Sequence, residues 1–559
     1  MSDSGCPKPV SVRGLPSASL PFSSIPSQSK LFVQYQEAPL SLKRFYPTAV
    51  ASYADLADRA GEVLAEYKVD RQPLCDSLAG INTRLGAGPE TLANIERLRR
   101  PDTVAILTGQ QAGLFTGPLY SIYKALSAIK AAECLSDRGI QAVPVFWMAT
   151  EDHDLAEVSN SLVIDNASRL FESRIRSDGS VDGSSVGRVA LEGSIVSVIE
   201  DLFAALPVTD FSAELHRDLS DAYSSATDLG QAFGRFLTGL LGKFGLVVVD
   251  PLDDAIKQLA APVYTEAIRH SDEMVTALTA RSDELAEAGY HAQVLVEDDH
   301  FPLFWHSDDG RRMALRRKAD GGFQAKGEKT SFCREELLDL AAASPGRFSP
   351  GVMLRPVVQD YLFPTLCYFG GGAEIAYFAQ NSEVYRILGR PVTPILHRQS
   401  FTVVEAKHAR TLERYRLEFA DLFAGEAAVL PRIIDEFVDK STAKLFADVE
   451  EKINTELNRL DQALSQMDVT LAENLATRRR KILYHIAALR KKYHFRRAET
   501  DETINRRLKS LFAALLPHGH LQERTLSIVS FLDRFGSNFI DWVYESIDLD
   551  DKGHRVLYL

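Results

Sequence analysis

The residues best suited to catalysis in this chain of 559 residues are Glu151-Asp152-His153-Asp154. They stand two residues after the apolar run Val143–Met148, a pattern typical of a buried strand. A histidine flanked by carboxylates can act as a general acid or base near neutral pH. We expect His153 to take the proton from a reacting ammonium group, with Asp152 or Asp154 orienting its ring. Glu151 completes the candidate catalytic set.

Two other interpretations of this acidic cluster stay open. It could hold a metal ion, but no second His/Cys cluster with ligand spacing occurs in the sequence, so a zinc site has little support and we expect no metal. It could also be an acidic helix start that complements the helix dipole.

A glycine-rich loop, Gly109–Gly117, is the second candidate. It lies between the apolar run Val104–Thr108 and a helical pattern over Ser121–Leu135. Glycines allow a ligand to approach the backbone, and free amides at a helix start favour an anion. The glycines are four residues apart and do not match the dinucleotide fingerprint, which disfavours nicotinamide binding. The alternative is a plain strand-to-helix turn. The candidate ligand-binding residues here are Gln110, Gln111, Gly113, Thr116 and Gly117.

A third polar cluster is spread over residues 350–400 and surrounds two further strand-like runs. Tyr361–Phe369 leads into the glycine triplet Gly370–Gly372, and Pro391–Leu396 ends at His397 and Arg398. The arginines and the histidine make this cluster positive, whereas the catalytic candidates are mostly acidic. Arg355 could instead form a structural ion pair with Asp360, and Glu374 could be only a carboxylate in the first turn of a helix. The candidate ligand-binding residues are Arg355, Gln359, Asp360, Gly371, Glu374, Tyr377, His397, Arg398 and Ser400.

These clusters require an α/β fold to bring them together. Successive strand, loop and helix patterns predict a parallel sheet, and the carboxyl ends of neighbouring parallel strands are where open α/β sheets bind ligands. Residues 291–327 alternate apolar and polar around glycine turns, which predicts a small inserted β-meander.

Apolar residues in the C-terminal third recur at spacings of four and three, the pattern of a coiled coil. The first helix carries Val449, Ile453, Leu457, Leu460, Leu464, Met467 and Leu471, and Ile482, Ile486, Leu489 and Tyr493 continue on a returning helix. A helical hairpin alone buries little apolar surface, so we expect a homodimer through the coiled coil.

The composition restricts partners and location. Asp and Glu number 76 against 63 Lys and Arg, for a net charge of -13, which argues against nonspecific nucleic-acid binding. We find neither a signal peptide nor a segment long and apolar enough to span a membrane. Five scattered cysteines without a C-x-x-C pair suggest a reducing compartment. We therefore expect a cytoplasmic protein.

Four motifs carry a resemblance to a known family. They are T-G-Q-Q-A-G-L-F-T-G-P-L-Y at 108–120, P-V-F-W-M-A-T-E-D-H-D at 144–154, L-R-P-V-V-Q-D at 354–360 and G-A-E-I-A-Y-F-A-Q at 372–380. They resemble the bacillithiol-biosynthesis cysteine-adding enzymes, also called cysteine ligases, from about Leu31 to the C-terminus. The resemblance implies a Rossmann-like core related to class I nucleotidyl-transferring enzymes, with connecting insertions and a dimerising helical hairpin.

The implied reaction joins the carboxyl group of cysteine to the amine of glucosaminyl malate. An adenine nucleotide, ATP or ADP, is implied near the helical region, but how cysteine is activated is not settled by the resemblance. The sequence contains neither H-x-G-H nor K-M-S-K-S, the two class I signatures, which argues against adenylate formation by the usual class I route. The rival hypothesis is a nonenzymatic, nucleotide-responsive coiled-coil adaptor.

The expected fold is thus α/β, with a Rossmann-like parallel sheet core, connecting insertions and a C-terminal α-helical coiled coil. We expect a poorly ordered tail over 1–30, a core over 31–404 with insertions at about 155–240 and 291–345, a helical coiled-coil arm over 405–515, and a helical C-terminal segment over 516–559.

Overall fold

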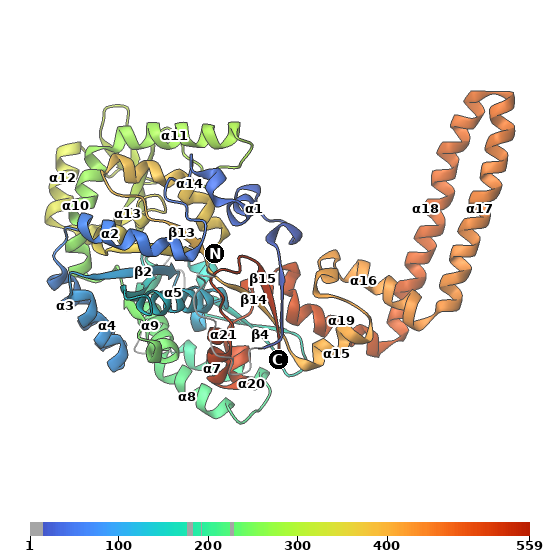
Figure 1. The fold of residues 1–559 in the computed structure, drawn as a ribbon, viewed down its shortest axis with the longest axis horizontal. Coiled ribbons are helices and arrows are strands. Elements are labelled where there is room, and N and C mark those ends of the chain that lie inside the picture. Colours follow the sequence, from blue (N-terminus) through green and yellow to red (C-terminus); the bar gives the residue numbers. More distant parts are fainter. Residues whose placement is uncertain (1–14, 176–182, 192, 224–227) are drawn as a thin grey trace. The chain divides into compact units, whose positions relative to one another are not determined.

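The computed structural model describes residues 15–175, 183–191, 193–223 and 228–559 (Figure 1). They form two compact units. The first comprises the described residues up to Thr402 together with Glu523–Leu557, and the second comprises Val403–Gln522 with Tyr558–Leu559.

A five-stranded parallel sheet forms the centre of the first unit. Its strands are β2 (Thr103–Gln110), β3 (Gln141–Met148), β6 (Val247–Val249), β12 (Thr365–Gly370) and β13 (Ile395–His397). Their order in the sheet is β13-β12-β2-β3-β6, and every neighbouring pair is parallel. The chain therefore winds outward from β2 in one direction and then from β12 in the other, which is the doubly wound arrangement of a Rossmann-like fold. The predicted fold class is confirmed.

The site follows from this winding. Helix α5 (Tyr120–Ser136) follows β2, and α14 (Gly372–Ile387) follows β12. Since the winding direction reverses between β2 and β12, their loops diverge and leave a crevice at the carboxyl ends of the strands. β2 and β3 are buried along almost their whole length, which explains why both read as continuous apolar runs.

Further helices belong to the same unit. They are α1 (Lys30–Glu37), α2 (Ala60–Glu66), α3 (Arg71–Arg84), α4 (Pro89–Arg99), α6 (Leu155–Val158), α7 (Ser194–Ala205), α8 (Ser212–Ala222), α9 (Leu229–Leu241), α10 (Asp254–Arg269), α11 (Ser271–Glu287), α12 (Arg334–Ala343), α13 (Arg355–Leu362), α20 (Val529–Phe535) and α21 (Asn538–Glu545).

Two insertions carry β-structure of their own. β4 (Asn160–Ile164) and β5 (Leu170–Arg174) form an antiparallel hairpin. The predicted β-meander is confirmed as part of a five-stranded antiparallel sheet of order β10-β9-β8-β7-β11. Its strands are β7 (His300–His306), β8 (Arg312–Arg317), β9 (Phe323–Ala325), β10 (Ser331–Phe332) and β11 (Phe348–Pro350).

Both ends of the chain differ from expectation. Within the expected tail, residues 1–14 lie outside the described residues, but β1 (Ser17–Leu20) pairs antiparallel with β15 (His554–Tyr558) in a sheet of order β1-β15-β14, with β14 at Ser400–Val404. The C-terminal segment is consequently not helical throughout. No local sequence pattern predicts this pairing, because the two strands lie more than 500 residues apart in the sequence.

The second unit is almost wholly helical. Its helices are α15 (Ala406–Arg414), α16 (Glu426–Ile433), α17 (Lys440–Met467), α18 (Val469–Thr500) and α19 (Glu502–Leu515). α17 and α18 lie side by side as an antiparallel hairpin (Figure 1). Hydrogen bonds join the two helices: the Arg479 guanidinium of α18 donates to Asn454 Oδ1 at 3.1 Å and to Asn458 Oδ1 at 2.7 Å, both on α17. α17 contains no buried residue, so the predicted apolar seam stays open within one chain.

Two further observations concern the expected environment. Across the described parts of the chain, no helix has the length and apolar character needed to cross a bilayer. Cys75, Cys333 and Cys367 carry free thiols.

Candidate active site

A cavity of about 570 Å³ lies at the carboxyl ends of the central strands. Its walls come from β2, β3, the start of α14, helix α5 and the inserted antiparallel sheet. The predicted site residues that line it are Gln110, Gln111, Glu151, Asp152, His153, Arg355, Gly371, Glu374, Tyr377 and Arg398. Three separate sequence clusters are therefore brought to one place. Asp154, Gly113, Thr116, Gly117, Gln359, Asp360, His397 and Ser400 are absent from its lining.

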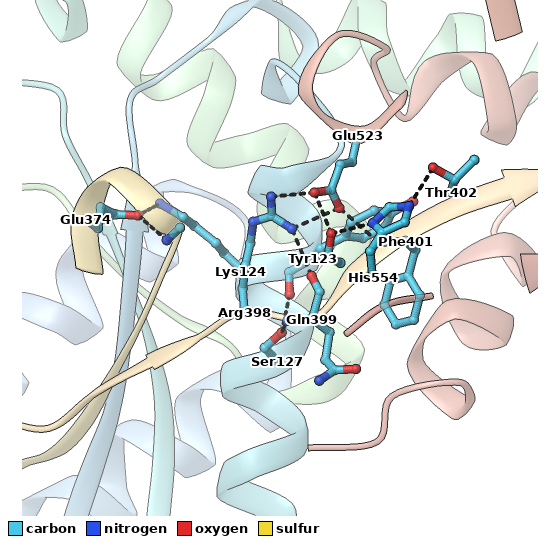
Figure 2. Close-up of polar contacts among 12 residues, drawn as sticks. Tyr123, Lys124, Ser127, Glu374, Arg398, Gln399, Phe401, Thr402, Glu523 and His554 are labelled. Carbon is cyan, nitrogen blue, oxygen red and sulfur yellow. Dashed lines mark hydrogen bonds and ion pairs between the residues drawn. The ribbon is translucent and has the colours of Figure 1, made fainter. Parts of the chain in front are cut away.

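A buried ion pair bridges the two glycine turns. Lys124 of α5 pairs with Glu374 of α14, as Figure 2 shows. Lys124 Nζ also donates to the Gly109 carbonyl at 3.0 Å and to Gln110 Oε1 at 2.8 Å, and Glu374 accepts from the Gly371 amide at 2.8 Å. Burial alone would raise the pKa of Glu374, but the nearby cations, Lys124 first, lower it. Glu374 is thus an ionised residue that holds the site together.

This pairing also bears on anion binding. The Gly371 amide at the start of α14 already donates its hydrogen bond to the Glu374 carboxylate. A phosphate at this helix start would have to displace that carboxylate, so the arrangement does not favour one there. Among the described residues, no group of three or more histidine, cysteine or acidic side chains is arranged to hold a metal ion.

Arg398 borders the cavity, but its charge is already neutralised. Its two terminal nitrogens donate to the Glu523 carboxylate at 2.9 and 2.7 Å (Figure 2). Ser400 lies deeper in the same network, where its hydroxyl donates to Glu523 at 2.8 Å and lies 2.7 Å from His554 Nδ1. His554 Nε2 in turn lies 2.9 Å from the Thr402 hydroxyl, and burial lowers the pKa of His554 to about 4. Ser400 therefore has a structural role and cannot meet a ligand.

Arg355 is another arginine that lines the cavity. It begins α13 and donates to the Tyr377 hydroxyl at 2.5 Å. The charge of Glu374 acts on its guanidinium, but among the described residues no carboxylate lies within ion-pair distance of it, in contrast to Arg398. A carboxylate of a ligand could complete this site with charge-assisted hydrogen bonds.

The acidic wall of the cavity follows β3. Gln111 Nε2 donates to Asp152 at 2.9 Å and to Glu157 at 2.8 Å, which places both carboxylates beside the start of the glycine-rich loop. Burial would raise the pKa of Asp152, but the hydrogen bond from Gln111 and the charge of Arg312 lower it. Asp152 is consequently an ionised acceptor that faces the cavity.

The other two predicted catalytic carboxylates have local structural roles. Glu151 forms a buried ion pair with Lys257 of α10, which also donates to the Phe348 carbonyl at 2.5 Å. Asp154 is the N-cap of α6 and accepts from the Glu157 amide at 3.2 Å. The helix-start interpretation thus fits Asp154, while Asp152 and His153 remain the pair that faces the cavity.

The remaining predicted residues pack inside the protein. Thr116 is fully buried, and a Cβ on Gly113 would meet Gly117 Cα at 3.0 Å, so the second half of the glycine-rich loop is a compact turn. Gln359 is also fully buried. Asp360 accepts from the Tyr385 hydroxyl, and burial raises its pKa to about 6. The ring of His397 packs 4.9 Å from those of Phe22 and Phe32.

Sequence reasoning missed Glu157, Lys124 and Arg312 among the residues that line the cavity. Lys124 could have been found as a lysine within the apolar pattern of the helix after the glycine-rich loop. Arg312 gave no such signal, because it lies on β8 of the insertion and reaches His153, 159 residues away in the sequence. Its side chain is nearly buried and stacks on Phe304, with the guanidinium carbon 3.7 Å from the ring centre.

Comparison with known proteins identifies a Rossmann-like domain followed by a coiled-coil domain, as the fold shows. The family described as "Bacillithiol biosynthesis BshC, N-terminal Rossmann-like domain" matches residues 19–399, and the corresponding "C-terminal coiled-coil domain" matches 401–559. A relative from Solibacter usitatus is 35% identical over 541 residues and covers 95% of each chain. One from Koribacter versatilis is 34% identical over 540 residues, covering 96% of this chain and 99% of the relative.

A third relative, from Salinibacter ruber, is 33% identical over 531 residues and covers 94% of this chain and 96% of its own. All three are named "Putative cysteine ligase BshC". A crystal structure of a putative arginyl-tRNA synthetase from Campylobacter jejuni aligns with 83% of this chain and 98% of its own at 10% identity, but its TM-score of 0.20 is too low to indicate a shared fold. The two family matches together span nearly the whole sequence, and the chain belongs to the BshC family of bacillithiol biosynthesis.

Proposed function

We propose that this protein is a cysteine ligase, which joins the carboxyl group of cysteine to the amine of glucosaminyl malate. The observation that carries the proposal is the division of charge in the cavity. Arg355 offers a cation with no carboxylate within ion-pair distance among the described residues, whereas Asp152 and Glu157 offer anions. A substrate with carboxylates and an ammonium group matches both walls.

The spacing of the walls supports a substrate of this size. Asp152 follows β3 and Arg355 contacts α14, which follows β12, and these strands flank β2 in the sheet. Adjacent strands lie about 4.8 Å apart, so the walls are separated by roughly 10 Å. A malate group can therefore bind Arg355 while the amino sugar extends toward Asp152.

Amide formation requires a deprotonated amine and an activated carboxyl group. The lowered pKa of Asp152 keeps its carboxylate ionised, so it can hold the ammonium group and orient the amine for attack. The amide at the start of α14 is already bonded, so a nucleotide phosphate is not expected to bind there.

Location and assembly are part of the same proposal. We place the protein in the cytoplasm, where a biosynthetic ligase would find cysteine, and we propose a homodimer through α17 and α18. The exposed apolar side chains of these helices support a second copy as the partner, since Leu460 is 46% and Leu489 is 60% exposed.

Binding measurements test the proposal against the adaptor hypothesis. Isothermal titration calorimetry should show glucosaminyl malate binding to the parent protein without nucleotide. Arg355→Met should weaken binding by about 10- to 100-fold, the effect of losing hydrogen bonds to a charged group worth about 1.5–3 kcal/mol. Arg386→Met, at an exposed arginine of α14, is the matched control and should bind normally. Binding of ATP alone, with no response to glucosaminyl malate, would favour the adaptor.

A further inference from the structure

The insertion supplies a side chain that contacts the candidate catalytic histidine. One terminal nitrogen of Arg312 lies 3.1 Å from His153 Nδ1. Its other nitrogens donate to the Ser349 hydroxyl at 2.9 Å and to the Pro350 carbonyl at 3.1 Å. With the stacking on Phe304, these contacts hold the guanidinium in one orientation. The inserted sheet therefore fixes the position of a cation beside the imidazole.

The chemistry of the two groups decides which one donates. A guanidinium has only donors and cannot be deprotonated in a protein, so His153 Nδ1 must be the acceptor. A neutral imidazole with an accepting Nδ1 carries its proton on Nε2. In the competing arrangement, His153 Nδ1 would donate to the Asp152 carboxylate. The Asp152 Oδ1 atom lies 3.6 Å from Nδ1, which is beyond hydrogen-bond distance. Asp152 instead accepts from the His153 backbone amide at 2.7 Å.

We propose that Arg312 is a positioning residue that holds His153 as the neutral Nε2–H tautomer, so that the ring offers a hydrogen-bond donor to a substrate oxygen in the cavity. The inference rests on the proposed ligase function only for the identity of that oxygen, which would be the acyl oxygen of cysteine. Donors aimed at an oxygen that gains negative charge are a large source of catalysis in acyl transfer. Arg312 acts through His153 and need not touch the substrate.

This assignment changes the role expected from the sequence. A general base at Nε2 would need the proton on Nδ1, where it would face the N–H group of Arg312. The surrounding charges agree with a neutral ring. Burial and the charge of Arg312 lower the pKa of His153, and the opposing effects of Asp152 and Asp154 are smaller. The geometry thus favours His153 as a donor, and leaves Asp152 to hold the ammonium group.

The tautomer can be measured without substrate. Long-range proton–nitrogen NMR of protein labelled with ¹⁵N at histidine, with His153→Gln used for assignment, should show Nε2 protonated and Nδ1 unprotonated. Arg312→Leu should lose this preference and raise the pKa of His153, whereas Arg312→Lys should partly keep it. Arg317→Leu on the same strand, whose arginine pairs with Asp272, is the matched control and should leave the spectrum unchanged.

A proton on Nδ1 in the parent protein, or the same tautomer preference in Arg312→Leu, would overturn the inference. The parent spectrum decides the tautomer even if both variants at 312 fail to fold. Because no reaction is involved, this result is independent of whether the ligase proposal holds.

Kinetics then separate a donor from a base. A glutamine can donate from a position near Nε2 but cannot act as a base. We expect His153→Gln to stay within about 10-fold of the parent kcat, and His153→Ala to lose about 10²- to 10³-fold, the effect of removing one oxyanion donor. Equal losses in both variants would contradict the donor role. Arg312→Leu alone should lower kcat relative to the parent protein. When it is added to His153→Ala, it should change kcat little further, because Arg312 acts through His153.

Discussion

The buried pair of Arg398 and Glu523 should be the costliest interaction in the first unit to break. Glu523 is 1% exposed and accepts four hydrogen bonds, two from Arg398, one from the Ser400 hydroxyl at 2.8 Å and one from the Phe401 amide at 2.9 Å. Glu523→Gln keeps the shape but removes the charge, and it leaves Arg398, 3% exposed, without a counter-charge. Removing one partner of a buried pair costs about 3–5 kcal/mol, and we expect that loss here.

Urea unfolding followed by tryptophan fluorescence measures this loss. All three tryptophans, Trp147, Trp305 and Trp542, lie in the first unit, so the signal reports the unit that contains the pair. Asp541→Asn is the matched control, because it breaks the exposed pair with Lys243, whose side chains are 40% and 47% exposed, and should cost less than about 1 kcal/mol. A loss below about 1 kcal/mol for Glu523→Gln would refute the reasoning.

The same pair predicts the direction of a pH dependence. Burial would raise the pKa of Glu523, but the charge of Arg398 and its hydrogen bonds lower it. A carboxylate with a lowered pKa in the folded state stabilises the fold above its unfolded pKa of about 4.3 and loses that contribution as the pH falls through the folded value. The difference in free energy of unfolding between parent and Glu523→Gln should therefore be constant near neutral pH and shrink below about pH 4. A difference unchanged down to pH 3 would contradict this assignment.

Three further predictions concern the site loop, the ligand and the hairpin. Gly109→Ala should destabilise the first unit by about 1–3 kcal/mol, because its Cβ would lie 2.6 Å from the Trp147 carbonyl oxygen, whereas Gly61→Ala on α2, which has open space, should be neutral or stabilising in the same urea assay. Asp152→Asn should lower kcat for amide formation by about 10-fold or more while the melting temperature stays within a few degrees, and an unchanged kcat would remove Asp152 from the site. Leu460→Glu with Leu489→Glu should convert a dimer into a monomer in light scattering, while Thr455→Glu should not. A monomeric parent would show that the hairpin needs no second copy.

The fold and the grouping of polar residues at the candidate site could be predicted because their signals are local. β2 and β3 are buried runs that each end in a polar loop, and parallel neighbours bring such loops to one edge. The sequence therefore predicted that Gln111, Asp152 and Glu374 would meet. β1 gave no such signal, since its partner β15 lies at the other end of the chain.

The direction in which each polar side chain points could not be predicted. Arg355 and Arg398 are equivalent as residue types, and only the distant Glu523 makes one neutralised and the other available. Likewise, the sequence alone suggests that His153, beside two carboxylates, is a base. The structure shows that Arg312, from a separate sheet, contacts its Nδ1. These roles depend on contacts more than 100 residues apart in sequence, which periodicity and spacing do not encode.

Mass spectrometry of the product formed by the purified protein tests the central claim most directly. Cysteine and glucosaminyl malate, incubated with the protein with and without ATP, should yield an amide whose mass equals the sum of the two substrates minus one water. The same incubation with Arg355→Met or Asp152→Asn should yield markedly less product. If the folded protein forms no such amide under either condition, or if both variants form it at the parent rate, this cavity is not the active site of a cysteine ligase.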